Sequence, residues 1–291
     1  MSGVDGRRPI VVGVDPDPSK RLALAWAADE ADRRALPLRL VHVRGVLIRG
    51  HRAGEEQLSW EQSGQASPQS VGEQALDKAV AFVESRRPAL EVSASLADGE
   101  PAWVLREEAQ NAAMVVVGSW HLGVRRELFS SASVALPLSA HAPCPVAVVP
   151  EPEHVTQQPA YIVVGVDGSP HSVAAVDLAF EEAALRGAAL RALYVWHTPL
   201  LGVLDEDAAM RECRRVLSET VAGRTATHPG VELHHEVVRG HPVQVLTEAS
   251  EHALSLVVGT RGHGGFTGML LGSVSQGALH HARCPVITVP V

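Results

Sequence analysis

The residues whose types and spacing best suit a chemical function are the glycines and serines of one stretch, Val257–Ser275. This stretch has the sequence VVGTRGHGGFTGMLLGSVS. Two residues separate Gly259 from Gly262, and nine separate Gly262 from the pair Gly272-Ser273. Glycines let the backbone approach a ligand with no Cβ in the way, and their N–H groups can then face an anion. A helix that begins at Gly272 would add free N–H groups and a dipole that favours phosphate. The stretch therefore predicts a phosphate-binding loop.

Side chains around these glycines have matching chemistry. Ser273 and Ser275 carry hydroxyl donors, and Arg261 and His263 sit where a cation could reach the outer phosphates. Alone, the pattern equally fits a glycine-rich surface turn before an ordinary capped helix. A second segment, Asp167-Gly168-Ser169, follows an apolar run of valines. Loops after the strands of an open α/β sheet meet at one edge, where ligands bind, so the pair of segments favours a nucleotide site.

The chain repeats itself, because five blocks of sequence occur twice in the same order. The paired blocks are PIVVGVD and YIVVGVD, LRLVHV and LRALYV, DGEPAWVL and RGHPVQVL, MVVVGS and LVVGT, and HAPCPVAVVP and HARCPVITVP. Asp15 and Asp167 are 152 positions apart, whereas Gly99 and Gly240 are 141 positions apart. The first copy therefore carries extra residues after its second strand. We predict a first domain over 1–150, a proline-rich linker over 151–160 and a second domain over 161–291.

Each copy alternates strand-like and helix-like segments. The first copy has short, valine-rich apolar runs of the kind that a parallel sheet buries on both faces: Ile10–Val14, Leu38–Val43, Val92–Leu96, Met114–Val117 and Pro145–Val149. Before one helical stretch of the second copy, Ser169 is placed as an N-cap and Pro170 at the first helical position. This alternation predicts an α/β fold with an open doubly wound sheet in each copy. The mixed segment Arg44–Gly72 is expected to be an excursion of the first copy, a solvated loop rather than a lid or a contact arm.

Composition excludes several classes of protein. The net charge of the 291-residue chain is −8, with no long basic run, which argues against nucleic acid or an anionic membrane surface as a partner. No apolar stretch approaches the roughly 20 residues of a membrane span, and the N-terminal segment has no signal-peptide core. A cytoplasmic location is therefore expected. The three cysteines are too few and too scattered for a disulfide framework or a zinc site.

The glycine spacing, the GVDGS turn and the terminal CPVITVP strand of the second copy resemble the universal stress protein family. The resemblance extends over both copies and so covers nearly the whole chain. It implies five-stranded parallel sheets of order 3-2-1-4-5, each flanked by helices. It also implies ATP or a related adenine nucleotide as ligand, with AMP or a cyclic nucleotide and accompanying Mg²⁺ left open. Finally, it implies that domains pair into dimers and that the chain regulates a stress response.

The candidate nucleotide-binding residues all lie in the second copy. They are Asp167 and Val195 at the adenosine; Val258, Gly259 and Gly262 at the ribose and phosphates; Gly272, Ser273, Val274 and Ser275 at the phosphates; and, from the loop chemistry above, Gly168, Ser169 and Arg261. No residue is assigned as catalytic or as a metal ligand.

The first copy departs from this pattern. Its second glycine position holds His121, and its third holds Ala132 or Ser131, depending on where a gap falls. Pro16 stands in place of Gly168 and removes a backbone donor. Asp17 stands in place of Ser169 and adds negative charge where phosphate would sit. We therefore predict that the first nucleotide site is degenerate.

Three functions remain open from the sequence. The first is a regulatory protein that binds an adenine nucleotide in its second domain. The second is an enzyme, a slow ATPase or a nucleotidyl transferase, although the chain lacks a Gly-x4-Gly-Lys-Ser/Thr loop and offers only Asp167 or His263 as a general base. The third is an interaction scaffold without nucleotide. The apolar fifth strands, Val146–Val149 and Val286–Val289, are expected to pair within or between chains, giving a pseudo-dimer or a homodimer.

Overall fold

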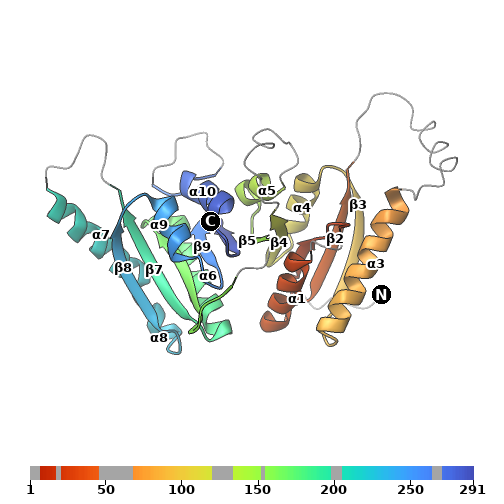
Figure 1. Ribbon diagram of the computed structural model, residues 1–291, viewed down its shortest axis with the longest axis horizontal. Helices are drawn as coiled ribbons and strands as arrows, with labels where there is room; N and C mark the ends of the chain where they lie inside the picture. The colour runs from red at the N-terminus through yellow and green to blue at the C-terminus, as the bar shows by residue number, and fades with distance from the viewer. Residues whose placement is uncertain are drawn as a thin grey trace, which may run out of the picture. The chain divides into compact units, whose positions relative to one another are not determined.

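The computed structural model describes residues 7–17, 21–45, 68–119, 134–151, 155–197, 205–263 and 271–291 (Figure 1). The chain divides into two compact units, Met1–Val117 and Gly118–Val291.

The first unit is an α/β sheet layered with helices (Figure 1). Its strands are β1 (Ile10–Gly13), β2 (Leu38–Arg44), β3 (Val92–Asp98) and the start of β4 (Met114–Ser119). They lie in the order β3-β2-β1-β4, and each neighbouring pair is parallel. The helices are α1 (Leu22–Arg34), α3 (Pro68–Arg86) and α4 (Pro101–Ala109). Val11 and Val12 of the central β1 are fully buried, as expected for a strand that is covered on both faces.

The second unit has a longer sheet. Its strands are β5 (Val146–Pro150), β6 (Tyr161–Val166), β7 (Ala189–Trp196), β8 (Leu233–Arg239), β9 (Leu256–Gly259) and β10 (Val286–Val289). Its helices are α5 (Ala135–His141), α6 (Pro170–Arg186), α7 (Glu206–Val221), α8 (Arg224–Thr227), α9 (Pro242–Ala249) and α10 (Ser273–His281). The strand order is β5-β10-β9-β6-β7-β8, so the strands of the second repeat have the predicted order 3-2-1-4-5.

The two fifth strands pair with each other, as predicted, and they do so within one chain. Strands β5 and β10 are antiparallel, with Val148 opposite Val286 and Val146 opposite Thr288. Every residue of both strands is buried. The strands of the second repeat are parallel to one another, as expected, and the antiparallel pair is the one formed by the last strands of the two repeats. This pairing places the last strand of the first repeat in the second compact unit. The boundary between the compact units, after Val117, therefore comes earlier in the chain than the predicted boundary between the repeats. The predicted limits of the repeats, at residues 150 and 161, remain a prediction.

Two local expectations can be compared with the structure. Ser169 is the N-cap of α6, with Pro170 at the first position, and its hydroxyl accepts a hydrogen bond from the N–H of Ser172 at 3.2 Å; this prediction is confirmed. The predicted loop Arg44–Gly72 was too long, because Arg44 ends β2 and α3 already begins at Pro68. Residues 46–67 lie outside the described part of the chain.

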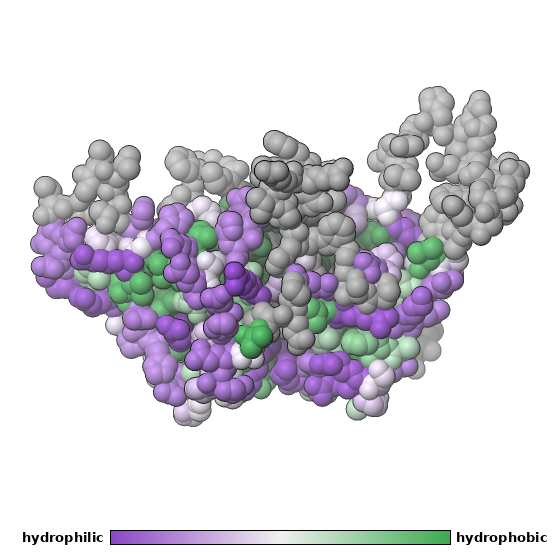
Figure 2. Space-filling model, viewed as in Figure 1, coloured by the Kyte–Doolittle hydropathy of each residue, from purple (hydrophilic) through white to green (hydrophobic). Residues whose placement is uncertain are grey.

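The surface and the cysteines agree with the composition. On the face shown in Figure 2, hydrophilic residues cover most of the described surface, and hydrophobic residues show in smaller areas. Cys144, Cys213 and Cys284 are free and buried. Burial raises the pKa of the Cys284 thiol to about 11, which makes it a packing residue rather than a redox centre. Among the residues that the structure describes, no helix is long and apolar enough to cross a membrane.

Candidate functional site

The turn after β6 is fixed by the side chains of its own residues. Asp167 Oδ1 accepts a hydrogen bond from the N–H of Ser169 at 2.9 Å. Gly168 has a φ of +82°, a conformation that favours glycine. Ser169 is 3% exposed and caps α6. The predicted segment Asp167-Gly168-Ser169, after the first strand of the second repeat, is therefore a single rigid turn at the carboxyl edge of the sheet.

The loop after β9 closes onto this turn. The N–H of His263 donates a hydrogen bond to Asp167 Oδ2 at 3.2 Å. The hydroxyl of Ser169 donates to the carbonyl oxygen of Arg261 at 3.5 Å. The structure thus brings together residues that lie more than ninety positions apart in the sequence. Residues 264–270 lie outside the described part of the chain.

Two glycines of this loop are required by close contact with the protein itself. A Cβ on Gly262 would lie 2.2 Å from Asp167 Oδ2, and a Cβ on Gly259 would lie 2.7 Å from His171 Cβ. Contacts this short are not tolerated by real side chains. From the sequence, both glycines are expected to allow the approach of a ligand. In the structure their absent side chains allow the loop to approach Asp167 and α6.

Helix α10 begins at the other end of the loop. Gly272 is its N-cap, and its N–H donates to the carbonyl oxygen of Thr260 at 2.8 Å. The N–H groups of Ser273, Val274 and Ser275 open the helix and have no acceptor within it, and they carry the positive end of the helix dipole. Such a helix start suits an anion.

The two candidate serines differ in their surroundings. Ser273 is exposed. Ser275 is 3% exposed, and its hydroxyl donates to the carbonyl oxygen of Gly259 at 2.6 Å. The Ser275 hydroxyl therefore fastens the loop to α10, a role that the sequence did not indicate, and its backbone N–H is the donor that it can offer to a ligand.

The two remaining candidates, Val195 and Val258, lie in strands. Val258 is 3% exposed and sits in β9 opposite Thr288. Val195 follows Tyr194, which is paired with Val166 at the end of β6. Val195 is therefore level with Asp167 at the same sheet edge, although the two come from different strands.

His171, which is not among the residues predicted from the sequence, also lies at this site. His171 is in the first turn of α6, beside Gly259. Burial lowers its pKa below the ordinary value of 6.5, and the positive charge of Arg261 lowers it further, whereas Asp167 acts in the opposite direction. The signal was present in the sequence, since His171 follows Ser169 by two positions in the same turn. Arg261 in the loop after β9 and His171 in α6 thus place two basic side chains near the carboxylate of Asp167.

The first repeat keeps part of this arrangement. Asp15 Oδ1 accepts a hydrogen bond from the N–H of Asp17 at 2.9 Å, which matches the turn at Asp167 despite the change of two residues. Pro137 falls within the first turn of α5. The predicted changes at His121, Ser131 and Ala132 lie outside the described residues. Within the described residues, no group of three or more metal-ligating side chains is found.

The architecture defines a doubly wound α/β protein with a glycine-bearing loop and a helix start at the carboxyl edge of its sheet. The chain belongs to the universal stress protein family, because the model of that family matches residues 6–150 and 161–290. A universal stress protein of Mycobacterium tuberculosis is 36% identical over 299 residues, covering 99% of this chain and 98% of the relative. One of Mycolicibacterium smegmatis is 35% identical and covers 96% of each chain.

Solved structures support the same fold. The crystal structure of a universal stress protein from Archaeoglobus fulgidus aligns over 97% of both chains with a TM-score of 0.70 and 16% identity. A putative universal stress protein from Pseudomonas aeruginosa aligns over 98% of this chain and 93% of its own, with a TM-score of 0.64 and 17% identity. At these identities the likeness concerns the fold alone.

Proposed function

We propose that this chain is a regulatory protein of the stress response that holds one adenine nucleotide, such as ATP, in its second repeat. The observation that carries the proposal is the hydrogen bond from the N–H of His263 to Asp167. This bond joins the two loops, and Thr260 of the same loop accepts the N–H of Gly272 at the start of α10, where three backbone N–H groups have no acceptor within the helix. Family membership supports the same assignment.

The residues fit the charge of a nucleotide. The N–H groups of Ser273, Val274 and Ser275 and the basic side chains of Arg261 and His171 are the donors for phosphates, as in other anion sites at helix starts. We assign the adenosine end to the turn at Asp167 and to the neighbouring end of β7 at Val195. The remaining candidate residues hold the phosphate donors and the adenosine-binding residues in position: Gly168, Ser169, Val258, Gly259, Gly262 and Gly272.

The test is to denature freshly purified full-length protein and to quantify the released nucleotide by chromatography. One adenine nucleotide per chain is expected, and it should be lost in Gly259→Ala, because the new Cβ would meet His171 at 2.7 Å. Gly230→Ala is the matched control, since nothing lies within 4 Å of a Cβ there. Asp167→Ala should weaken binding, whereas Asp15→Ala, its equivalent in the first repeat, should not.

The other outcomes are equally informative. Two nucleotides per chain would contradict a single site in the second repeat. No released nucleotide, together with no heat of binding when ATP is added, would contradict the proposal and favour a scaffold. Steady turnover of ATP that Asp167→Ala abolishes while binding persists would favour an enzyme.

A further inference from the structure

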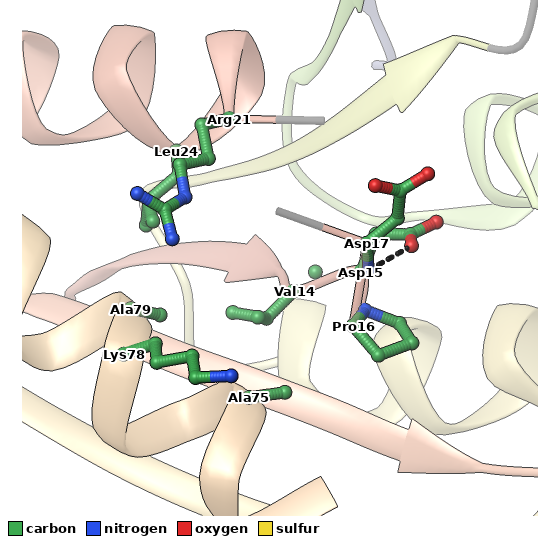
Figure 3. Close-up of a pocket in the computed structure, with 10 residues that line it drawn as sticks. Val14, Asp15, Pro16, Asp17, Arg21, Leu24, Ala75, Lys78 and Ala79 are labelled. Carbon is green, nitrogen blue, oxygen red and sulfur yellow. Dashed lines mark hydrogen bonds between the residues drawn. The ribbon is translucent and has the colours of Figure 1, made fainter. Parts of the chain in front are cut away.

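A pocket is present in the first repeat, at the end of β1 (Figure 3). It is lined by the loop after β1, by the start of α1 and by the middle of α3. Arg21 extends into it from α1 and Lys78 from α3, on either side of Val14 (Figure 3). Arg21 also lies over the ring of Phe82, 5.5 Å from its centroid, and this contact limits the directions that the guanidinium can take. Two cationic groups therefore share one recess.

The second repeat supplies a comparison within the same chain. Strands β3 and β8 begin at Val92 and Leu233, 141 positions apart, and the helices before them, α3 and α7, correspond at the same offset. Contacts agree with this correspondence. Gly72 of α3 lies against His42, and of their equivalents, Tyr194 packs against the buried cluster that contains Cys213.

The recess in the first repeat is lined by two residues of α3, Ala75 and Ala79, that are smaller than their equivalents in the second repeat. In the second repeat, a Cβ on Gly168 would lie 2.5 Å from Val216 Cγ1, so the side chain of Val216 fills the space beside the turn. The equivalent of Val216 is Ala75, which lines the pocket with Pro16, the equivalent of Gly168. Ala79 likewise replaces Thr220. The smaller side chains of α3 therefore leave space in the first repeat that the side chains of α7 fill in the second.

The charges differ in the same direction. By the same offsets, Arg21 corresponds to Val173 and Lys78 corresponds to Glu219. The first repeat therefore places two positive charges where the second has an apolar and an acidic residue. The carboxylates of Asp15 and Asp17 point away from these two cations (Figure 3), and Asp15 accepts the N–H of Asp17. The pocket has a basic end and an acidic rim.

We infer that the first repeat binds a small molecule through one anionic group, a carboxylate or a phosphate, held between Arg21 and Lys78. Charge-assisted hydrogen bonds from both side chains would hold such a group, and the start of α1 adds the positive end of a helix dipole. Leu24, Ala75 and Ala79 are buried and supply an apolar floor. A triphosphate is disfavoured, because its outer charges would meet the acidic rim. The inference does not depend on the nucleotide site of the second repeat.

The test follows the alanine methyl resonances of the full-length protein by NMR while inorganic phosphate or acetate is added at constant ionic strength. At least one of the two anions is expected to shift the methyl signals of Ala75 and Ala79 in a saturable way. Lys78→Glu installs the residue of the second repeat and should weaken that binding by more than about tenfold, because it removes one hydrogen bond to a charged group and places a negative charge beside the anion. Ala75→Val fills the recess with all charges kept and should abolish the shift of Ala79. Arg283→Gln, at an exposed arginine of the second unit, is the control for general loss of charge.

The inference is overturned if neither anion gives saturable shifts, or if Lys78→Glu binds as tightly as the wild type. Should Ala75→Val fail to fold, Lys78→Glu still decides the question, because Lys78 is exposed. ATP that shifts Ala75 and Ala79 at lower concentrations than phosphate does would also overturn the inference, since it would show a nucleotide in this pocket.

Discussion

Asp167 accepts two backbone hydrogen bonds, and the one from His263 joins the loop after β9 to the turn after β6 at 3.2 Å. Its other carboxylate oxygen accepts the N–H of Ser169 at 2.9 Å. Both oxygens are therefore engaged in fixing the loops, although each keeps a lone pair that can accept a further bond. This arrangement makes Asp167 a better organiser of a binding site than a general base.

Gly262→Ala is expected to weaken nucleotide binding while leaving the fold intact. The new Cβ would lie 2.2 Å from Asp167 Oδ2, so the loop or the Asp167 carboxylate must move, and either movement disturbs the bond from His263. We expect affinity for ATP to fall by more than about tenfold, which corresponds to ~1.4 kcal/mol, as measured by calorimetry. Gly230→Ala has open space around its Cβ and should bind as the wild type does. Unchanged affinity in Gly262→Ala would show that the closed loop is not needed.

Gly168→Ala is expected to destabilise the second unit, and Val216→Ala should partly reverse the effect. Alanine at position 168 would have a φ of +82° and a Cβ 2.5 Å from Val216 Cγ1. The left-handed backbone alone costs about 1–2 kcal/mol, and the contact with Val216 adds strain. In a double-mutant cycle by chemical denaturation, the pair should be less destabilised than the sum of the single variants by roughly 0.5–3 kcal/mol. If the changes in the free energy of unfolding are simply additive, the alanine at position 168 does not clash with Val216.

The sequence was sufficient for the order of the elements and for the cap at Ser169, because both depend on local patterns of apolar and capping residues. It predicted that β5 and β10 pair with each other but not that they pair antiparallel, since the apolar character of an edge strand carries no information on the direction of its partner. The functions of Gly259 and Gly262 were also beyond the sequence. Their close contacts are with His171 and Asp167, which come from another part of the chain, and sequence spacing carries no information on such approaches.

The two serines of α10 are expected to respond differently to replacement by alanine. The Ser275 hydroxyl is buried and donates to the carbonyl oxygen of Gly259 at 2.6 Å. Ser275→Ala should therefore lower the free energy of unfolding by about 1 kcal/mol or somewhat more. Ser273 is exposed, so Ser273→Ala should leave stability within about 0.5 kcal/mol and act only on nucleotide affinity. Equal stability of the two variants in urea denaturation would contradict the role given to Ser275.

Protonation of His171 is expected to be linked to nucleotide binding. Burial and the charge of Arg261 lower the pKa of His171 below 6.5 in the folded protein. The unfolded chain therefore binds the proton more readily, and the stability that comes from this residue is complete above pH 6.5 and is lost as the pH falls through the lowered pKa. Phosphates beside His171 would favour its charged form and so raise its pKa.

NMR titration of the His171 ring signals checks both parts of this prediction. Without nucleotide the midpoint should lie below pH 6.5, and saturating ATP should move it upward. Affinity for ATP should then increase as the pH is lowered below 6.5, and His171→Asn should remove most of this dependence. Asn is polar and of similar size but does not titrate. As a control for loss of the imidazole itself, the affinity of the variant for ATP is compared with that of the wild type at pH 8, where both side chains are neutral. A midpoint that ATP leaves unchanged would place the phosphates away from α6 and would require another set of donors for the site.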